Sequence, residues 1–388
     1  MNKKLLTIIF MGLFNTKTLA EISSLASNIE AYLTKKPNIS TIYHVATPNK
    51  VLAQGPSSSL KSKNKQIIAR RLQIQTIEIT KTMTAAAIML LHEQNKLRLN
   101  DPIIQHIPAH DWPNSQPPAW ANQATIHHLL SHRTGMASYR YNNKYYIDFD
   151  AKIDEQTFKR KVLGYAANKV LFYGIDQVVY ASATDYFILG MIIENISKQP
   201  LNVFFKENLF KPLDMHNTFL PSFKQNLNDL TSKDKQVSYK PLLPFGDGGV
   251  VSAVEDIYKW NMALHTMKIV SKASYDQMTQ AHSAIDTCCQ FSDITLNMLK
   301  QLGYKEPCAK QEWVEVNYGY GLYIIPLASN RKEILYCISP ESYFGEEAWY
   351  LPTKNISIVL ATNQAKPEEE TMNMTSRLRN QILNLIYK

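Results

Sequence analysis

The sequence lacks a long apolar run after its first 20 residues. A membrane-crossing helix needs about 20 consecutive apolar residues, and no later segment of the 388-residue chain supplies them. The chain also lacks a Cys-x-x-Cys pair, low-complexity tracts and internal repeats. These absences argue against a membrane-spanning protein and a structural zinc site, and they leave a folded domain as the expectation.

Cysteine is scarce: the chain has only Cys288, Cys289, Cys308 and Cys337. An even number permits two disulfides in an oxidising compartment. The neighbours Cys288 and Cys289 do not easily pair with each other, whereas Cys308 bonded to either one would close a short loop. Buried free thiols are an equal alternative.

Acidic residues are outnumbered by basic ones, 33 to 42, which gives a formal net charge of +9. The basic residues are spread along the chain, as in the stretch from Lys61 to Arg71, which is typical of a solvated loop. No nucleic-acid-binding motif accompanies the charge, so we expect no nucleic-acid partner. Hydrophobic residues make up 45% of the chain, as in a packed globule.

The first 20 residues have the features of an export signal. Lys3 and Lys4 precede the short apolar run from Leu5 to Phe14, and Thr18-Leu19-Ala20 ends in small residues. We expect residues 1–20 to be a signal peptide and residues 21–388 to form a periplasmic or secreted protein with no stable membrane span after cleavage. No Cys follows the run, so no lipid anchor is indicated. The alternative is an uncleaved, buried N-terminal helix.

Hydrophobic periodicity predicts strands at both ends of the chain and helices between them. The expected strands are 39–45, 51–54, 320–327, 334–338, 347–351 and 356–361, with a β-like run at 67–79. The expected helices are 21–36, 81–94, 126–131, 185–196, 201–209, 256–265 and 368–387. Residues 85–91 are apolar on every side, which indicates a helix buried in the middle of the domain. Residues 283–312 have little strand character.

Six stretches of the chain occur in a recognisable order. They are Ile79-Thr80-Lys81-Thr82-Met83-Thr84-Ala85-Ala86-Ala87-Ile88, Lys96-Leu97-Arg98-Leu99-Asn100-Asp101-Pro102-Ile103, Ile126-His127-His128-Leu129-Leu130-Ser131-His132-Arg133-Thr134-Gly135-Met136, Leu189-Gly190-Met191-Ile192-Ile193-Glu194 through Pro212-Leu213-Asp214-Met215, Gly248-Gly249-Val250-Val251-Ser252, and Ile358-Val359-Leu360-Ala361-Thr362-Asn363. Together they resemble the serine β-lactamases and penicillin-binding proteins, nearest to the branch of class C β-lactamases, D-alanyl-D-alanine carboxypeptidases and esterases. The resemblance covers roughly residues 25–385.

The resemblance and the order of elements predict the same fold class, α+β. We expect a β-lactamase/transpeptidase-like architecture, with an antiparallel sheet built from both chain ends and flanked by helices. A mainly helical lobe, at approximately residues 95–250, is expected between the sheet-forming ends. The family uses no cofactor, and none is expected here.

The resemblance also implies three catalytic motifs: a Ser-x-x-Lys nucleophile, a Tyr-x-Asn box, and a Lys-Thr-Gly or His-x-Gly strand. Glu78 stands at the serine position, while Lys81 is present. Tyr180-Ala181-Ser182 matches the second box at its tyrosine, with Ser182 replacing the asparagine. The third box falls at Ser339-Pro340-Glu341, and neither Lys-Thr-Gly nor His-x-Gly occurs from residue 318 onward.

These positions define the candidate site. Glu78, Lys81 and Tyr180 hold the catalytic positions, and Ser182, Ser339 and Glu341 are candidates for substrate binding. Glu78 and Lys81 are three residues apart and share a helix face, so the carboxylate would hold Lys81 cationic instead of leaving it poised as a base. The positive end of the helix favours a carboxylate at Glu78.

Other polar residues near the motifs are weaker candidates. The hydroxyl of Thr80 is a poor substitute nucleophile, because it should point differently on the helix. His127, His128 and His132 have no accompanying carboxylate motif, so we interpret them as helix-surface histidines and expect no metal site. Arg133 is interpreted as structural, and Tyr318-Gly319-Tyr320-Gly321 as the start of a strand.

Two functions fit these residues. In the first, the protein is a non-acylating pseudoenzyme that binds a small molecule, a peptide or a peptidoglycan-like ligand in the old cleft. In the second, it is an active hydrolase of an ester or amide (a β-lactam, a D-Ala peptide or a carboxylic ester), with a rearranged site built on Lys81 and Tyr180, and with Glu78 as a candidate third member. The sequence carries no signal for an oligomeric state.

Overall fold

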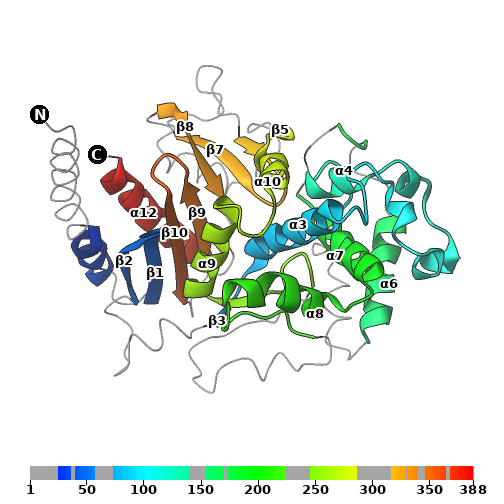
Figure 1. Ribbon diagram of the computed structural model, residues 1–388, viewed down its shortest axis with the longest axis horizontal. Helices are drawn as coiled ribbons and strands as arrows, with labels where there is room; N and C mark the ends of the chain where they lie inside the picture. The colour runs from blue at the N-terminus through cyan, green and yellow to red at the C-terminus, as the bar shows by residue number, and fades with distance from the viewer. Residues whose placement is uncertain are drawn as a thin grey trace, which may run out of the picture.

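The structure of the protein, a computed structural model, describes residues 25–35, 40–56, 73–139, 154–168, 174–177, 179, 181–222, 245–285, 316–327, 330–338, 346–363 and 368–387. Within these residues, eight strands form one antiparallel sheet in the order β2-β1-β10-β9-β8-β7-β6-β5 (Figure 1). A separate pair, β3 and β4, lies beside it.

The strands are β1 (Ser40–Thr47), β2 (Lys50–Pro56), β3 (Gln73–Gln75), β4 (Val251–Ala253), β5 (Ser283–Ile285), β6 (Val316–Tyr318), β7 (Tyr323–Leu327), β8 (Asn330–Cys337), β9 (Glu347–Leu351) and β10 (Ile356–Asn363). The α-helices are α3 (Ile77–Glu93), α4 (Ile126–Leu130), α6 (Glu155–Asn168), α7 (Ala183–Ser197), α8 (Leu201–Phe205), α9 (Val254–His265), α10 (Lys272–Thr279) and α12 (Glu368–Ile386). Residues 25–34 are also helical. Short 3-10 turns lie at Ile103–Gln105, Ala109–Asp111, Pro113–Ser115, Ala119–Asn122 and Lys211–Leu213, and a π-helical turn lies at Lys206–Phe210.

The sheet joins the two ends of the chain. β1 pairs antiparallel with β10, with Tyr43 opposite Leu360, and β2 pairs with β1 on its other side. The first strands therefore lie next to the last one, as Figure 1 shows in blue and dark orange. This arrangement confirms the predicted fold class.

Each face of the sheet packs against a different set of helices. Successive side chains of a strand point to opposite faces, and β10 shows this clearly. Ile358 and Leu360 belong to a core shared with residues 25–34 and α12. Val359 and Ala361 belong to the larger core that contains the buried residues of α3, α7 and α9. The sheet is thus covered by helices on both sides.

Helix α3 lies at the centre of the molecule. Residues 85–89 are fully buried, which agrees with the prediction of a helix apolar on all sides. Its nearest helical neighbour is α7, and Figure 1 shows the two running past each other between the sheet and the outer helices. The first turns of α3, where Glu78 and Lys81 lie, are therefore held by packing from several directions.

The β-like run predicted at 67–79 is wrong over its last three residues. Within the described part of this run, only 73–75 form a strand, and α3 begins at Ile77. The β-branched residues Ile77 and Ile79 favour strands locally, but both are buried against the core in the helix. Tertiary packing has overridden local propensity.

Other element predictions need smaller corrections. The helix predicted at 201–209 divides into α8 and a π-helical turn at Lys206–Phe210. The strand predicted at 320–327 begins at Tyr323, and residues 283–285, expected to lack strand character, form β5. Helices α6 and α10 were not predicted, although the buried residues Phe158, Val162 and Ala166 of α6 recur every four residues.

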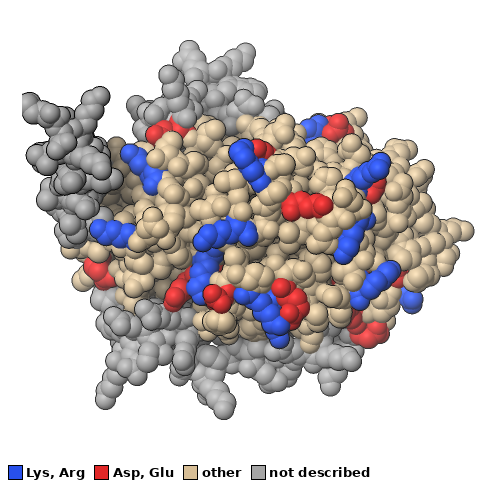
Figure 2. Space-filling view, viewed as in Figure 1, with Lys and Arg blue, Asp and Glu red and all other residues tan. Residues whose placement is uncertain are grey.

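Charges of both signs are interspersed on the face shown in Figure 2. Lys and Arg side chains lie close to Asp and Glu in several places, and the described surface of this face carries no extended region of one sign. Two ion pairs of this kind are Lys211 with Glu207 and Lys272 with Asp276.

No helix in the described part of the chain is both long and apolar enough to cross a bilayer. The predicted signal peptide lies outside the described residues. Cys288, Cys289 and Cys308 also lie outside the described residues, and so their predicted disulfide pairings stay predictions. Cys337 is buried in β8.

Candidate functional site around Lys81

The N-terminus of α3 is tied to two other parts of the chain. Thr76, which precedes the helix, donates through its backbone N–H and its hydroxyl to the carbonyl of Val250, at 2.7 and 3.0 Å. The N–H of Ile77 donates to the buried carboxylate of Glu346, at 3.3 Å. These bonds give partners to the N–H groups of Thr76 and Ile77 at a helix end that has no side-chain cap. They fix the direction in which the first turn presents Glu78.

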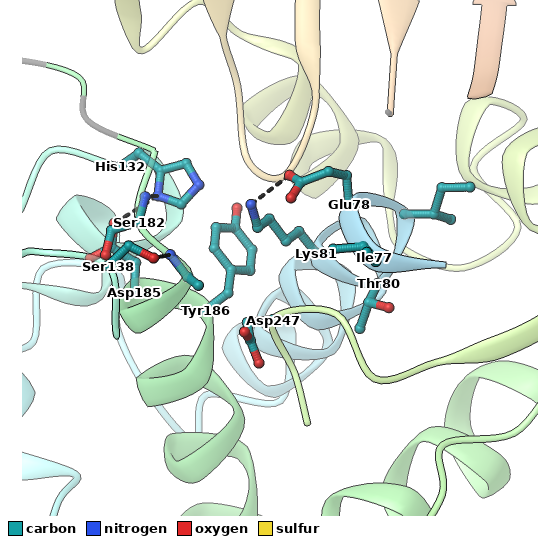
Figure 3. A network of polar contacts seen from close by, with 12 residues as sticks. Ile77, Glu78, Thr80, Lys81, His132, Ser138, Ser182, Asp185, Tyr186 and Asp247 are labelled. Carbon is teal, nitrogen blue, oxygen red and sulfur yellow. Dashed lines mark hydrogen bonds and ion pairs between the residues drawn. The ribbon is translucent and has the colours of Figure 1, made fainter. Parts of the chain in front are cut away.

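Glu78 and Lys81 form an ion pair on one face of α3. The Nζ of Lys81 is 2.5 Å from Oε2 of Glu78, and their side chains are 6% and 22% exposed (Figure 3). An opposite charge at this distance stabilises the ammonium form of lysine. The pair therefore combines a buried cation with a carboxylate that still reaches solvent. The expectation that these two residues share a face is confirmed.

Two buried tyrosines lie beside the ion pair. Lys81 Nζ lies 5.9 Å from the ring centre of Tyr186. Burial raises the pKa of Tyr186 and of Tyr318 well above the ordinary value of 10, and the negative charge of Glu78 adds to the effect in both. Both phenols are therefore neutral at ordinary pH, and the Tyr186 hydroxyl donates to the carbonyl of Leu130 at 2.8 Å. Neither one is a phenolate base.

His132 and Asp185 form a second polar pair in the same region. The Nδ1 of His132 is 2.7 Å from Oδ2 of Asp185, and both side chains are essentially fully buried. The hydroxyl of Thr134 donates to the other carboxylate oxygen at 2.5 Å. Burial lowers the pKa of His132 well below 6.5, with a further contribution from the charge of Lys81. Burial also raises the pKa of Asp185 well above 3.8.

The second ring nitrogen of His132 has no hydrogen-bond partner among the described residues. Nε2 is buried, and the ring lies 5.0 Å from that of Tyr186 and 5.1 Å from that of Tyr318. In Figure 3 the ring lies on the opposite side of the site from Glu78, with Tyr186 and Lys81 between them. His132 thus presents an unused nitrogen beside the ion pair.

The interpretation of His132 as a helix-surface histidine is wrong. Helix α4 ends at Leu130, and His132 lies beyond it with a positive φ of 57°. His128 has a local role, because its Nδ1 accepts from the backbone N–H of Thr125 at 3.1 Å. The sequence signal for the His132 pair is faint: a histidine just after one apolar helix and an aspartate at the start of another.

The other predicted site residues have varied positions. Ser182 is buried at the N-cap of α7, where its hydroxyl accepts from the N–H of Thr184 at 3.2 Å, and its own N–H lies 3.4 Å from Nδ1 of His132. Tyr180, Ser339 and Glu341 lie outside the described residues, so their roles stay predictions.

Thr80 points away from Lys81, as expected. Its hydroxyl donates to the carbonyl of Thr76 at 2.5 Å and accepts from the N–H of Val250 at 3.1 Å. In Figure 3 it lies on the opposite side of α3 from the ion pair. A hydroxyl committed to two backbone groups has no geometry for attack in the cleft.

The segment Tyr318-Gly319-Tyr320-Gly321 is a hairpin connection, not the start of a strand. Tyr318 ends β6, and β7 begins at Tyr323. A Cβ on Gly321 would lie 2.9 Å from the carbonyl oxygen of Lys81, and its φ is +76°. The connection therefore packs directly on the turn of α3 that carries Lys81. It forms one wall of the site.

Arg133 holds this region together. Its guanidinium donates to the carbonyls of His282 and Asp176, at 2.8 and 2.6 Å, which supports the structural role expected for it. No group of three or more His, Cys, Asp or Glu residues in the described chain is placed to hold a metal ion.

Comparison with known proteins places this geometry in a family. The Beta-lactamase family model matches residues 79–381. The chain is 26% identical over 208 residues to the putative penicillin-binding protein PbpX of Bacillus subtilis, covering 51% of this chain and 48% of that protein. It is 29% identical over 162 residues to protein flp of Staphylococcus aureus, covering 42% and 30% respectively. The match thus spans less than half the length of either relative.

Solved structures share the fold at low sequence identity. EstCE1, a hydrolase with promiscuous acyltransferase activity, superposes with a TM-score of 0.67 at 19% identity, over 95% of this chain and 99% of that one. The penicillin-binding protein homologue of Pyrococcus abyssi superposes with a TM-score of 0.64 at 20% identity, over 94% and 77%. With a family match over most of its length and this fold, the chain belongs to the β-lactamase family.

Proposed function

We propose that this protein is a non-acylating member of the β-lactamase family that binds a peptide-like ligand in the cleft beside Lys81. The observation that carries the proposal is the Glu78–Lys81 ion pair at 2.5 Å. In a Ser-x-x-Lys site, the lysine assists a serine hydroxyl that attacks the substrate. Here the residue that the resemblance places at the serine position is Glu78, and its carboxylate forms an ion pair with the lysine.

The chemistry of Glu78 supports the loss of acyl transfer. Nζ of Lys81 is engaged with the carboxylate of Glu78 at 2.5 Å and is therefore not placed to take a proton from a nucleophile. A carboxylate is also a weak nucleophile towards an amide, and its product would be an anhydride that water cleaves. The nearby hydroxyls of Thr80 and Ser182 are engaged with backbone groups. The described part of the cleft thus offers no activated nucleophile of the serine type.

The ligand class is proposed from the family. The relatives include proteins described as penicillin-binding and a D-amino acid amidase from Ochrobactrum anthropi, whose names indicate amide ligands. A peptide-like or peptidoglycan-like molecule is therefore the ligand proposed here. A peptidoglycan-like ligand lies outside the cytoplasm, and the predicted signal peptide at residues 1–20 would bring the protein to it. Cell fractionation with N-terminal sequencing of the purified protein tests that part.

The test of acylation is incubation with a fluorescent penicillin, followed by intact-mass measurement. We expect no covalent adduct on the wild-type protein. Glu78→Ser restores the hydroxyl, and we expect at most slow labelling because the third motif is also altered. Glu78→Gln is the matched control: it removes the same charge without adding a nucleophile and should stay unlabelled. A stoichiometric adduct on the wild-type protein would overturn the proposal.

The binding itself needs a separate measurement. An acyl-D-alanyl-D-alanine peptide should raise the melting temperature of the wild-type protein without being consumed. Lys81→Met should abolish that stabilisation, since it removes the buried cation. Absence of any stabilisation at millimolar peptide contradicts binding of this ligand class.

One observation favours a second candidate, an active hydrolase. The unpartnered Nε2 of His132, with Nδ1 held 2.7 Å from Asp185, has the arrangement of a general base oriented by an acidic side chain, although burial lowers the pKa of His132 and weakens it as a base. In that role Nε2 would take a proton from water as the water oxygen bonds to an ester carbonyl, and then return it to the departing alkoxide. Turnover of a chromogenic ester that is lost in His132→Gln and Lys81→Ala, with unchanged circular dichroism, would select this candidate.

A further inference from the structure

A groove separate from the Lys81 cleft lies between the C-terminal end of α3, the start of α4 and the connection from α10 to β5. Its volume is about 700 Å³. The described residues that line it are His92, Asn95, Leu97, Arg98, Leu99, Asn100, His127, Gln277, Gln280, His282 and Tyr320. We call it the α3–α10 groove; Figure 1 shows α10 above α3, with α4 to its right.

The β6–β7 connection divides this groove from the cleft. Tyr318 lies on the cleft side, with its ring 5.1 Å from that of His132. Tyr320, two residues later, lies on the groove side, with its hydroxyl 2.7 Å from Nδ1 of His127. Glu78, Lys81 and His132 do not line the groove. Its chemistry is therefore independent of the function proposed above.

The groove combines apolar and polar side chains and is nearly uncharged. Arg98 is the only Lys, Arg, Asp or Glu among the lining residues that the structure describes, and it is exposed. Burial lowers the pKa of His127 to about 4, with smaller contributions from neighbouring cations. Burial also lowers the pKa of His282. Both imidazoles are therefore neutral near pH 7, and each offers one donor and one acceptor.

Hydrogen bonds to carbonyls show which ring nitrogens carry the proton. Nε2 of His282 lies 2.6 Å from the carbonyl oxygen of Gln277. A carbonyl only accepts, so this nitrogen donates, and Nδ1 of the neutral ring is left as an acceptor. By the same argument, Nδ1 of His92 donates to the carbonyl of Leu97 at 3.2 Å.

A further acceptor in the groove has no partner in the described structure. The side-chain oxygen of Gln277 is buried and makes no hydrogen bond. A buried acceptor left unpaired is unfavourable by an amount comparable to a lost hydrogen bond. A ligand that draws the Gln277 side chain towards the groove and donates a hydrogen bond to this oxygen would remove that penalty. Beside it, the rings of His282 and Tyr320 stack at 4.1 Å and 9° and form a rigid wall.

We infer that the α3–α10 groove binds a neutral, hydroxyl-rich ligand of the saccharide class. Sugar hydroxyls both donate and accept, which matches bare imidazole nitrogens, the Gln277 oxygen and the amides of Asn95 and Gln280. A carboxylate or a fully ionised phosphate monoester would bring acceptors only and leave these acceptors unpaired. An apolar ligand would bury all of these groups without partners.

The test is isothermal titration of the whole protein with two neutral probes, the N-acetylglucosamine trimer and maltotriose. We expect saturable binding of at least one of them. Gln277→Leu keeps the side-chain size but removes the amide, so it should weaken binding about tenfold. Gln123→Leu, an exposed position outside the groove, is the matched control and should leave the affinity unchanged. Lys81→Met should also leave it unchanged.

Several outcomes would overturn the inference. One is the absence of saturable binding for both sugars at millimolar concentration. Another is equal affinity in Gln277→Leu and wild type, when both show the same circular dichroism. A third is displacement of the sugar by inorganic phosphate together with loss of binding in Arg98→Ala, which would identify an anion site instead. Loss of binding in Lys81→Met would place the sugar in the cleft.

Discussion

At the scale of single residues, the proposed function rests on the Glu78–Lys81 ion pair. Glu78, which the family resemblance aligns with a serine, pairs with Lys81 at 2.5 Å. The sequence predicted this pair, because a three-residue spacing on a helix leaves little freedom. It did not predict the buried His132–Asp185 pair, whose members are 53 residues apart. Such contacts depend on how α4 and α7 pack, which local patterns do not encode.

Also at this scale, His265 makes stability depend on pH. The residue is buried on α9, with its ring stacked 4.1 Å from Tyr350 and its Nδ1 3.0 Å from the hydroxyl of Tyr275. Burial lowers its pKa from 6.5 to about 3. Between these two values the unfolded chain binds the proton more readily, so the free energy of unfolding decreases as pH falls below about 6.5. One such group contributes up to about 1.4 kcal/mol per pH unit.

The measurement is urea unfolding at pH 4, 5, 6 and 7. His265→Phe keeps an aromatic ring in the stack but cannot titrate, so the pH dependence of its unfolding free energy should be shallower than that of the wild type. The dependence should not vanish, since the pKa values of His127 and His132 are also lowered by burial. His216→Phe, at a side chain 79% exposed, is the control with unchanged dependence. Identical slopes in wild type and His265→Phe would contradict the argument.

At the scale of elements, α3 and the β6–β7 connection act as one unit. Gly321 has a φ of +76° and lies so close to α3 that an added Cβ would be 2.9 Å from the Lys81 oxygen. We expect Gly321→Ala to destabilise the fold by about 1–3 kcal/mol, because the backbone is strained and the connection must move. Gly164→Ala in α6, where the Cβ would make an ordinary 3.5 Å contact with Pro113, should instead stabilise it by about 0.5–1 kcal/mol. Urea unfolding of both variants checks this, and equal effects would refute it.

The same elements show what the sequence could and could not predict. The buried middle of α3 was predictable, since residues 85–91 are apolar at every position. The first turn, from Ile77, was assigned to a strand because isoleucine and threonine favour strands locally. The hairpin around Gly321 was interpreted as a strand start, since nothing in four residues shows that a helix lies against them. In both cases the structure depends on contacts between segments that are far apart in the sequence.

At the scale of the whole molecule, the last helix closes the fold. The sequence predicted that α12 would turn apolar residues such as Leu378 and Ile382 to a core, and both are fully buried. It gave no signal that Arg379, between them, is fully buried as well. The guanidinium lies 2.9 Å from the carboxylate of Glu347 and 4.6 Å from the ring of Trp349. One buried ion pair therefore joins the C-terminal helix to the middle of the sheet.

Removal of one member of this ion pair should strongly lower the free energy of unfolding. Arg379→Met leaves Glu347 buried without its cation, which costs about 3–5 kcal/mol, although Trp349 still donates to the same oxygen at 2.9 Å. The double variant Arg379→Met/Glu347→Gln should recover much of the loss, because no uncompensated charge remains. Lys211→Met, in a pair with Glu207 that is 58% and 43% exposed, should change stability by less than about 1 kcal/mol. If urea unfolding shows that Arg379→Met costs no more than Lys211→Met, the ion pair does not hold α12 to the sheet.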